Sequence, residues 1–264
     1  KLALVGALTF LFGCSQPGGA DGVRPPEGTP AGLLVAAGTN HVHTYDLRAG
    51  GPWQKRFEYD AASAAVAVDE PRRELIQART TGSEFVTVTV YDVDTFAVKR
   101  AFEIRTGDHA PSVRAVAVSR DGRYMALNLP EFSQPQVVLW DLEANAEVYR
   151  GLRNVQRSGF VFTPNGELVV PLQALGGNPP AIVLFRIADL VASADGNVSG
   201  ATVVTFTAEE RGAGTLKPAI SSDGSALVYE SQGSVWLTEL AYEAGTLVGA
   251  SVPRRLTTGP EPSH

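Results

Sequence analysis

A hairpin-like pattern recurs along the chain and restricts what it can fold into. An apolar alternation, a tight polar turn and a second apolar run follow one another at 115–127, 159–170 and 218–229, with a weaker copy at 65–76. Asp-Gly or Asn-Gly stands at the turn of the first three copies, and these dipeptides supply the positive φ angles of a tight hairpin. Because side chains alternate between the two faces of a strand, the pattern predicts pairs of antiparallel strands.

A second unit follows each hairpin: an apolar strand that ends in an aromatic residue. The reference positions are Tyr45, Tyr91, Trp140, Phe185 and, in a degenerate copy, Thr238, with gaps of 46, 49, 45 and 53 residues. Each period holds about four strand-length segments, and a four-stranded antiparallel sheet repeated at this spacing is typical of a β-propeller blade.

The predicted fold class is therefore all-β, a β-propeller of four-stranded antiparallel blades with about five blades present. In the third unit the four strands are expected at 114–119, 123–128, 136–142 and 146–152. A two-sheet sandwich is the competing fold, but it would not explain the repeat.

Aromatic, aspartate and arginine side chains of the repeat are expected to have structural rather than catalytic roles. The aromatic at the strand end is expected to stack on the neighbouring blade, and the Asp after it (Asp46, Asp92 or Asp141) is expected to cap a turn rather than to catalyse. The arginine pairs Arg72/Arg73 and Arg254/Arg255 lie beside turn residues and are interpreted as solvated loop charges.

The N-terminal segment has the composition of a secretory signal. Residues 2–13 are a run of 12 apolar or small residues without charge, preceded by Lys1. A membrane-spanning helix needs about 20 such residues, so the run fits the apolar region of a signal peptide. It leads directly into Cys14, the only cysteine, so no intrachain disulfide is expected.

The sequence Leu-Phe-Gly-Cys at 11–14 resembles a bacterial lipobox, which implies lipidation of Cys14. A plain signal peptide with a chance cysteine is the alternative. The predicted organisation is a signal peptide and lipobox at 1–14, a flexible Pro- and Gly-rich tether at 15–32, and an incomplete propeller at 33–264. The lipid would attach the protein to a membrane. Ser15 after the lipidated position resembles an outer-membrane address, so the periplasmic face of a bacterial membrane, with the outer membrane favoured, or the cell surface is expected.

The repeats also resemble known families. VSRDGRYMA and ISSDGSALVY are similar to the repeats of TolB-type and WD-repeat-like bacterial propellers, and 90–104 followed by 111–127 resembles the YVTN-type repeat. The resemblance covers 33–258 and concerns structural motifs, so it implies blades and carries over no catalytic residue. Because such propellers have six or seven blades, it also implies that the chain is cut at its C-terminus.

The sequence carries few signals of chemistry. The net charge is −6 and no dense basic run occurs, which argues against a nucleic-acid partner. No nucleophile elbow, phosphate loop or metal-binding motif is found, and His41 and His43 lack a third ligand. No cofactor, metal or catalytic residue is therefore predicted.

Loops that depart from the repeat are the candidate binding residues. The segment 129–136 carries Phe132 and Gln134, the segment 171–181 carries Leu172 and Leu175, and the connector 107–112 carries His109. The first two segments occupy the same place in their blades and should project from one face as a recognition rim. A third segment, 191–204, is interpreted as a long outer hairpin.

These patterns predict a scaffold that binds a protein, another envelope partner or a ligand. The alternative is a propeller enzyme or cofactor protein of lactonase-like or quinoprotein-like type, with its site in the axial channel. Small or apolar residues at the inner-strand positions around Ala115, Gly159 and Lys217 favour the scaffold.

Overall fold

The computed structural model describes residues 7–9, 30–37, 41–48, 54–60 and 64–257, the last range with gaps at 70, 83, 107–112, 132–133, 153–154, 157–158, 174–178, 194–197, 207–216 and 232. The chain divides into two compact units, 1–64 and 65–264, which are described separately.

The first unit is one antiparallel sheet, for which only the backbone is described. Its strands are β1 (Ala7–Thr9), β2 (Pro30–Ala37), β3 (His41–Arg48) and β4 (Gln54–Asp60), in that order across the sheet. Strand β1 lies inside the predicted signal segment, and β2 begins inside the predicted tether. Cys14 lies outside the described residues, so its lipidation stays a prediction.

The second unit contains four antiparallel sheets, each made of strands consecutive in the chain. Sheet I is β5 (Ala64–Asp69), β6 (Glu74–Thr81), β7 (Phe85–Asp92) and β8 (Val98–Arg105). Sheet II is β9 (Ala115–Val118), β10 (Tyr124–Glu131), β11 (Gln134–Asp141) and β12 (Ala146–Gly151). Sheet III is β13 (Val161–Phe162), β14 (Glu167–Leu172), β15 (Ala181–Arg186) and β16 (Ala201–Thr205), with helix α1 (Ile187–Ala192) between the last two. Sheet IV is β17 (Ala219–Ile220), β18 (Ala226–Ser231), β19 (Ser234–Glu243) and β20 (Thr246–Ala250), and β21 (Arg254–Arg255) also pairs with β19.

The turn between the first two strands has a similar geometry in each sheet. Gly122, Gly166 and Gly224 have φ of +69°, +79° and +78°, the left-handed region that the Asp-Gly and Asn-Gly dipeptides predict. In the weaker copy Arg73 adopts this conformation, with φ of +51°. A hydroxyl at the end of the first strand supports the turn in sheets II and IV: Ser119 Oγ accepts the N–H of Tyr124 at 2.8 Å, and its counterpart in sheet IV is Ser221.

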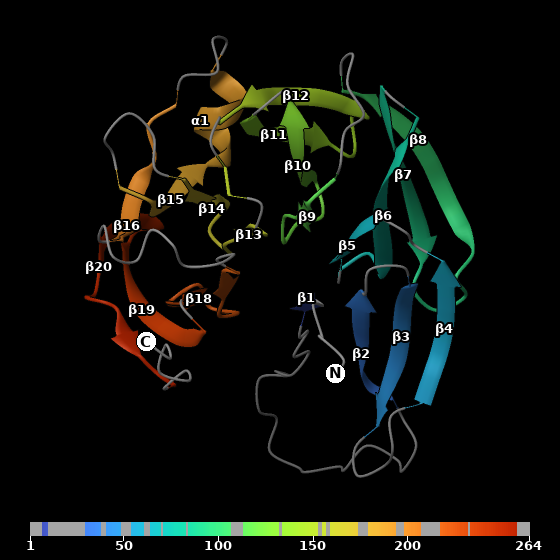
Figure 1. Ribbon diagram of the computed structural model, residues 1–264, viewed down its shortest axis with the longest axis horizontal. Helices are drawn as coiled ribbons and strands as arrows, with labels where there is room; N and C mark the ends of the chain where they lie inside the picture. The colour runs from blue at the N-terminus through green and yellow to red at the C-terminus, as the bar shows by residue number, and fades with distance from the viewer. Residues whose placement is uncertain are drawn as a thin grey trace, which may run out of the picture. The chain divides into compact units, whose positions relative to one another are not determined.

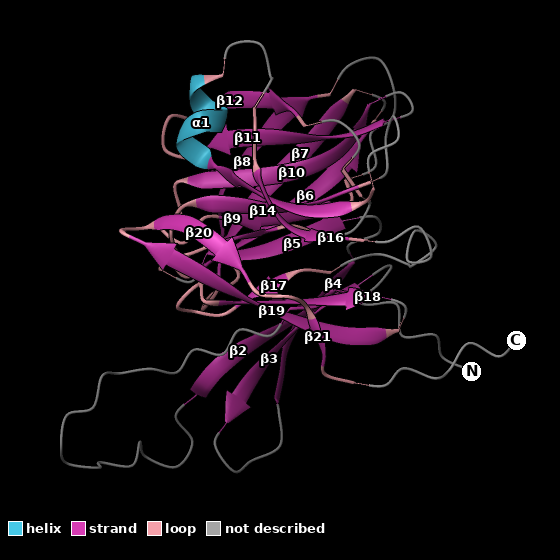
Figure 2. Cartoon of the chain, turned by 90° about the vertical axis from the view of Figure 1, so that its left-hand side faces the viewer, coloured by secondary structure: helices cyan, strands magenta, loops and turns pink. Residues whose placement is uncertain are grey.

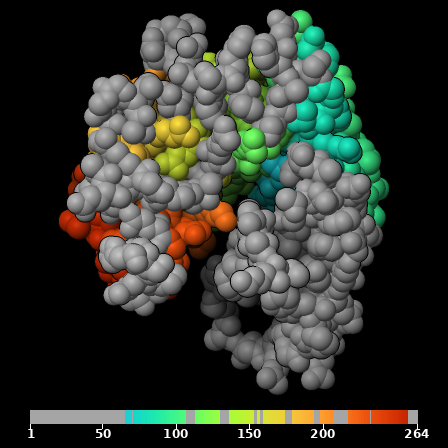
Figure 3. All heavy atoms as spheres, in the orientation of Figure 1, coloured from blue at the N-terminus to red at the C-terminus, as the bar shows by residue number. Residues whose placement is uncertain are grey.

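The sheets of the second unit follow one another in chain order (Figure 1). Apolar side chains fill the layer between each pair of neighbouring sheets. Figure 3 shows the teal atoms of sheet I next to the green atoms of sheet II. The layer between sheets I and II includes Ile76 and Leu127, and the layer between II and III includes Leu139 and Leu168. The first strands β9, β13 and β17 lie side by side, so the sheets radiate from their inner strands.

The strand-end aromatics follow the predicted packing in two of the described cases. Trp140 of sheet II stacks on Phe102 of sheet I, with ring centroids 5.4 Å apart. Phe185 of sheet III is buried in the layer shared with sheet II. Tyr91 differs, because its ring stacks on Phe96 in the following turn of its own sheet, at 5.7 Å.

Two predicted loops are more regular than their sequences indicate. Strand β10 continues to Glu131 and β11 begins at Gln134, so 129–136 is mostly a continued hairpin in which Pro130 pairs in register with Pro135. The predicted hairpin at 191–204 is preceded by α1, which overlaps its first two residues and lies beside β12 (Figure 2). Ile187 and Leu190 are the buried residues of α1 and lie on one face, which explains why six residues suffice for a helical turn here.

No helix among the described residues is both long enough and apolar enough to cross a membrane.

Candidate binding face

The antiparallel order of the strands gives each sheet of the second unit two different ends. The turns from the first to the second strand and from the third to the fourth lie at one end, which we call the turn face. The turns from the second to the third strand and the connectors between sheets lie at the other end, the connector face. Of the predicted rim residues, Gln134 at the start of β11 and Leu172 at the end of β14 lie toward the connector face.

Aspartates on the turn face cap turns, as the sequence predicts. Asp92 Oδ1 accepts the N–H groups of Asp94 and Thr95, at 3.0 and 2.8 Å. Asp141 Oδ1 accepts those of Glu143 and Ala144, at 2.9 and 2.8 Å. The Ala144 N–H contributes most to holding the pKa of Asp141 below its ordinary value, with the Arg123 guanidinium 3.0 Å from Oδ2 adding to it.

The same kind of cap makes Asp223 an unusually strong acid. Hydrogen bonds from Ser221 Oγ and from the N–H and hydroxyl of Ser225 lower its pKa to about 2. Because the folded pKa lies below the unfolded value, this cap stabilises the fold above about pH 4 and is lost as the pH falls through 2. We expect the side-chain carboxyl ¹³C signal of Asp223 to titrate near pH 2. A midpoint near 4 would show that the cap is not formed in solution.

The prediction of a solvated loop charge was wrong for Arg72, whereas Arg73 lies exposed in the turn, as predicted. Arg72 donates to Asp69 Oδ2 at 3.2 Å, to the carbonyl oxygen of Asp121 at 3.1 Å and to Glu143 Oε1 at 2.9 Å, so it ties sheet I to sheet II. Arg73 pairs with Asp94. The sequence suggests turns around these residues but does not show that two adjacent turns come within reach of one side chain.

A further arginine of the turn face joins two sheets that are not consecutive in the chain. Arg120 of sheet II donates to the carbonyl oxygen of Ser222 of sheet IV at 2.9 Å. The charged side chains described on this face therefore make numerous contacts within the molecule.

The predicted rim residues are only partly placed. His109, Phe132 and Leu175 lie outside the described residues, and for Gln134 only the position at the start of β11 is given. Leu172 is the last residue of β14, paired with Ala181, rather than part of a loop. Its half-buried side chain packs against the layer between sheets II and III, which leaves little of it for a partner.

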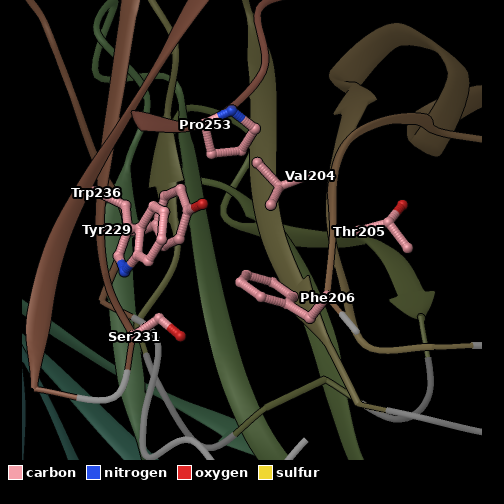
Figure 4. Close-up of a pocket in the computed structure, with 7 residues that line it drawn as sticks. All are labelled: Val204, Thr205, Phe206, Tyr229, Ser231, Trp236 and Pro253. Carbon is pink, nitrogen blue, oxygen red and sulfur yellow. The ribbon is translucent and has the colours of Figure 1, made fainter. Parts of the chain in front are cut away.

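A pocket of about 220 Å³ lies between sheets III and IV, near the connector face (Figure 4). Its lining residues come from the end of β16, from β18 and β19, and from the segment before β21; they are Val204, Thr205, Phe206, Tyr229, Ser231, Trp236 and Pro253. Phe206 and Tyr229 are buried and meet edge to face, with centroids 5.6 Å apart. Trp236 and Pro253 are half-buried, and no lining residue carries a charge.

The connector face also exposes Phe85, at the start of β7, with 36% of its surface accessible. Neither Phe85 nor the pocket was predicted. Phe85 follows a Thr-Gly-Ser turn, a local signal that could have identified it. The pocket has no such signal, because its walls come from two sheets and from segments about 50 residues apart.

The described residues contain no group of three or more His, Cys, Asp or Glu side chains arranged to hold a metal ion. The lining of the pocket offers aromatic surface, the hydroxyl groups of Thr205 and Ser231, and the phenol of Tyr229.

Solved structures share this fold at low sequence identity to the chain. No protein-family model matches it, and no curated protein is similar to it in sequence. Solved structures do match. TolB from Acinetobacter baumannii has a TM-score of 0.55 at 11% identity, covering 87% of this chain and 53% of that one. The WD40 domain of Toxoplasma gondii coronin has a TM-score of 0.53 at 14% identity, covering 83% and 55%.

The β-propeller domain of Cps50 (Swd1) from Myceliophteria thermophila has a TM-score of 0.50 at 18% identity, covering 74% of this chain and 55% of that one. The fold is a β-propeller. The predicted fold class is confirmed, and sheets I to IV are propeller blades. The chain spans about half the length of these propellers. At these identities the match shows the fold alone.

Proposed function

We propose that this protein is a binding scaffold, an extracytoplasmic propeller held to a membrane by a lipid on Cys14, which recognises its partner with the connector face. The observation that carries the binding proposal is the difference between the two faces of the second unit. The aromatic pocket and the exposed ring of Phe85 are on the connector face, whereas Arg72 and Arg73 on the turn face bond to Glu143 and Asp94.

Exposed aromatics and uncharged pockets are typical of residues that anchor a protein partner. Arg72, Arg73 and Asp141 are already engaged within the molecule, so binding through them would break existing hydrogen bonds. The same propeller fold serves many functions, so the proposal depends on this difference between faces rather than on the fold.

The pocket favours a scaffold over a cofactor enzyme. A volume of about 220 Å³ is below the roughly 300–1,000 Å³ of pockets that enclose a drug-sized ligand. Its lining lacks an acid, a histidine or a cysteine that could transfer protons or act as a nucleophile. It is large enough for one side chain of a partner.

Site-specific photocrosslinking tests the binding proposal. Benzoylphenylalanine in place of Phe85 is expected to crosslink a partner in cells that produce the protein, because this ring lies on the proposed face. The same group at Ser222, exposed on the turn face, is the matched control and is expected to give little crosslinking. Equal crosslinking from both positions, or crosslinking from Ser222 alone, would contradict the proposal.

The membrane anchor is tested separately. The lipobox-like sequence at 11–14 supports the anchor. We therefore expect the protein expressed from its own gene to incorporate radiolabelled palmitate and to sediment with membranes. Cys14→Ser should remove the label and release the protein into the soluble fraction. Unlabelled wild-type protein would exclude the anchor and leave the binding proposal standing.

A further inference from the structure

Three side chains from adjacent strands form one rung across blade IV at the pocket. Tyr229 of β18 pairs in register with Trp236 of β19, and Trp236 pairs with Arg255 of β21. Residues paired directly across antiparallel strands lie on the same face of the sheet. Arg255 therefore belongs to the face that carries two walls of the pocket.

Arg255 is held at this place by neutral groups. Its Nε donates to Ser234 Oγ at 3.0 Å and to the carbonyl oxygen of Thr257 at 2.8 Å, and its Nη2 donates to Ser234 Oγ at 2.6 Å. Ser234 pairs in register with Ser231, another lining residue. These bonds hold the guanidinium beside Ser234, one strand position across from a residue that lines the pocket.

Arg255 differs in its partners from three arginines of the turn face. Arg72, Arg73 and Arg123 each contact a carboxylate. Within the described part of the chain, no carboxylate lies within ion-pair distance of Arg255. Its positive charge is therefore available to a ligand, and a guanidinium hydrogen-bonds most strongly to a carboxylate or a phosphate.

The two parts of the site restrict the ligand. The uncharged aromatic pocket takes one apolar group, and its volume limits that group to about the size of a single side chain. The adjacent cation takes an anion. A carboxylate next to a compact aromatic or branched aliphatic group satisfies both, and the C-terminal residue of a peptide has this chemistry.

We propose that the Tyr229–Trp236–Arg255 rung and the adjoining pocket bind carboxylates that carry one aromatic or branched aliphatic group, as a peptide C-terminus or a small free acid does. The proposal deepens the proposed function, because it rests on the connector face being the binding face. Arg255 selects the carboxylate, and the walls of the pocket select the apolar group.

The test is an NMR titration of the full chain with matched acid and amide probes. We expect 3-phenylpropionate to bind with a Kd on the order of 1 mM, as for a fragment of this size, and to shift the indole signal of Trp236. Its amide, 3-phenylpropanamide, should bind roughly tenfold more weakly because it lacks the charge-assisted hydrogen bond. Acetyl-Ala-Ala-Phe and its C-terminal amide form the second pair. Tighter binding of this peptide acid than of 3-phenylpropionate assigns a peptide C-terminus, and weaker binding assigns a small acid.

Two adjacent arginines provide a matched control. Arg254 pairs in register with Leu237 and so lies on the opposite face of the sheet. We expect Arg255→Gln to abolish the preference for acid over amide and Arg254→Gln to preserve it. Equal affinities for acid and amide in the wild type, equal effects of the two substitutions, or no binding of either acid at 10-fold above the expected Kd would overturn this assignment. Crosslinking from Phe85 would be unaffected by that result, so the proposed function is tested independently.

Discussion

Replacing Gly122 with alanine is expected to lower the free energy of unfolding by about 2–4 kcal/mol, through backbone strain and a broken buried contact. Gly122 has φ of +69°, which disfavours any residue with a Cβ. A Cβ at this position would overlap Arg72 Nη1 and Asp69 Oδ2. Asp69 is 1% exposed, so displacing the Arg72 guanidinium would remove the ion pair of a buried carboxylate and leave it the Arg72 N–H, 3.2 Å from Oδ1.

Gly166 is the matched control for this substitution. It occupies the corresponding turn of blade III with φ of +79°, but nothing lies within 4 Å of the place that an added Cβ would occupy. Gly166→Ala should therefore cost only the backbone strain, about 1 kcal/mol. Urea unfolding of both variants measures the difference. Equal losses would show that the position of Arg72 and Asp69 against the Gly122 turn contributes nothing to the stability of the junction between blades I and II.

The contrast between these glycines shows what the sequence could and could not predict about the fold. Asp-Gly and Asn-Gly specify local backbone geometry, so both turns and their flanking strands were predictable. The different surroundings of Gly122 and Gly166 depend on which turns come together in space. Arg72 reaches Asp121 and Glu143 across 49 and 71 positions of sequence, and no local pattern encodes that.

The local sequence pattern also failed to predict the regular secondary structure of two segments. The proline-containing sequence at 129–136 is typical of a loop. Its first residues nevertheless continue β10 to Glu131, and its last residues begin β11 at Gln134, because the two strands pair in register. Helix α1 is six residues long, too short for a helical period to show. In both cases tertiary packing outweighs local propensity.

The candidate site was less predictable than the fold. The sequence pointed to strand ends and connectors on one face, and the pocket lies near that face. It selected residues by departure from the repeat, however, whereas Tyr229 and Trp236 lie inside repeat strands. Pro253 and Arg255 reach the same place because β21 pairs with β19.

The second large effect is expected at Leu168, in the layer between blades II and III. Its side chain is fully buried and packs in the cluster that includes Phe162 and Leu139. Leu168→Ala removes buried surface and leaves a cavity that rigid strands on both sides cannot readily close. We expect the free energy of unfolding to fall by about 3–4 kcal/mol.

Val98 is the control for this substitution, because 58% of its surface is exposed at the start of β8. Val98→Ala should change the free energy of unfolding by no more than about 0.5 kcal/mol. Urea unfolding followed by circular dichroism gives both values. A loss below about 1 kcal/mol for Leu168→Ala would mean that the packing between blades II and III is looser than the structure shows.

The central claim is that consecutive four-stranded sheets stack face to face in chain order, and one NMR measurement tests it most directly. In protein labelled at Trp and Phe, the propeller arrangement predicts nuclear Overhauser contacts between the rings of Trp140 and Phe102, which belong to different blades and lie 5.4 Å apart. If these contacts are absent in a folded sample and Trp140 contacts only residues of its own sheet, the stacking is contradicted. The two-sheet sandwich would then again be a competing fold.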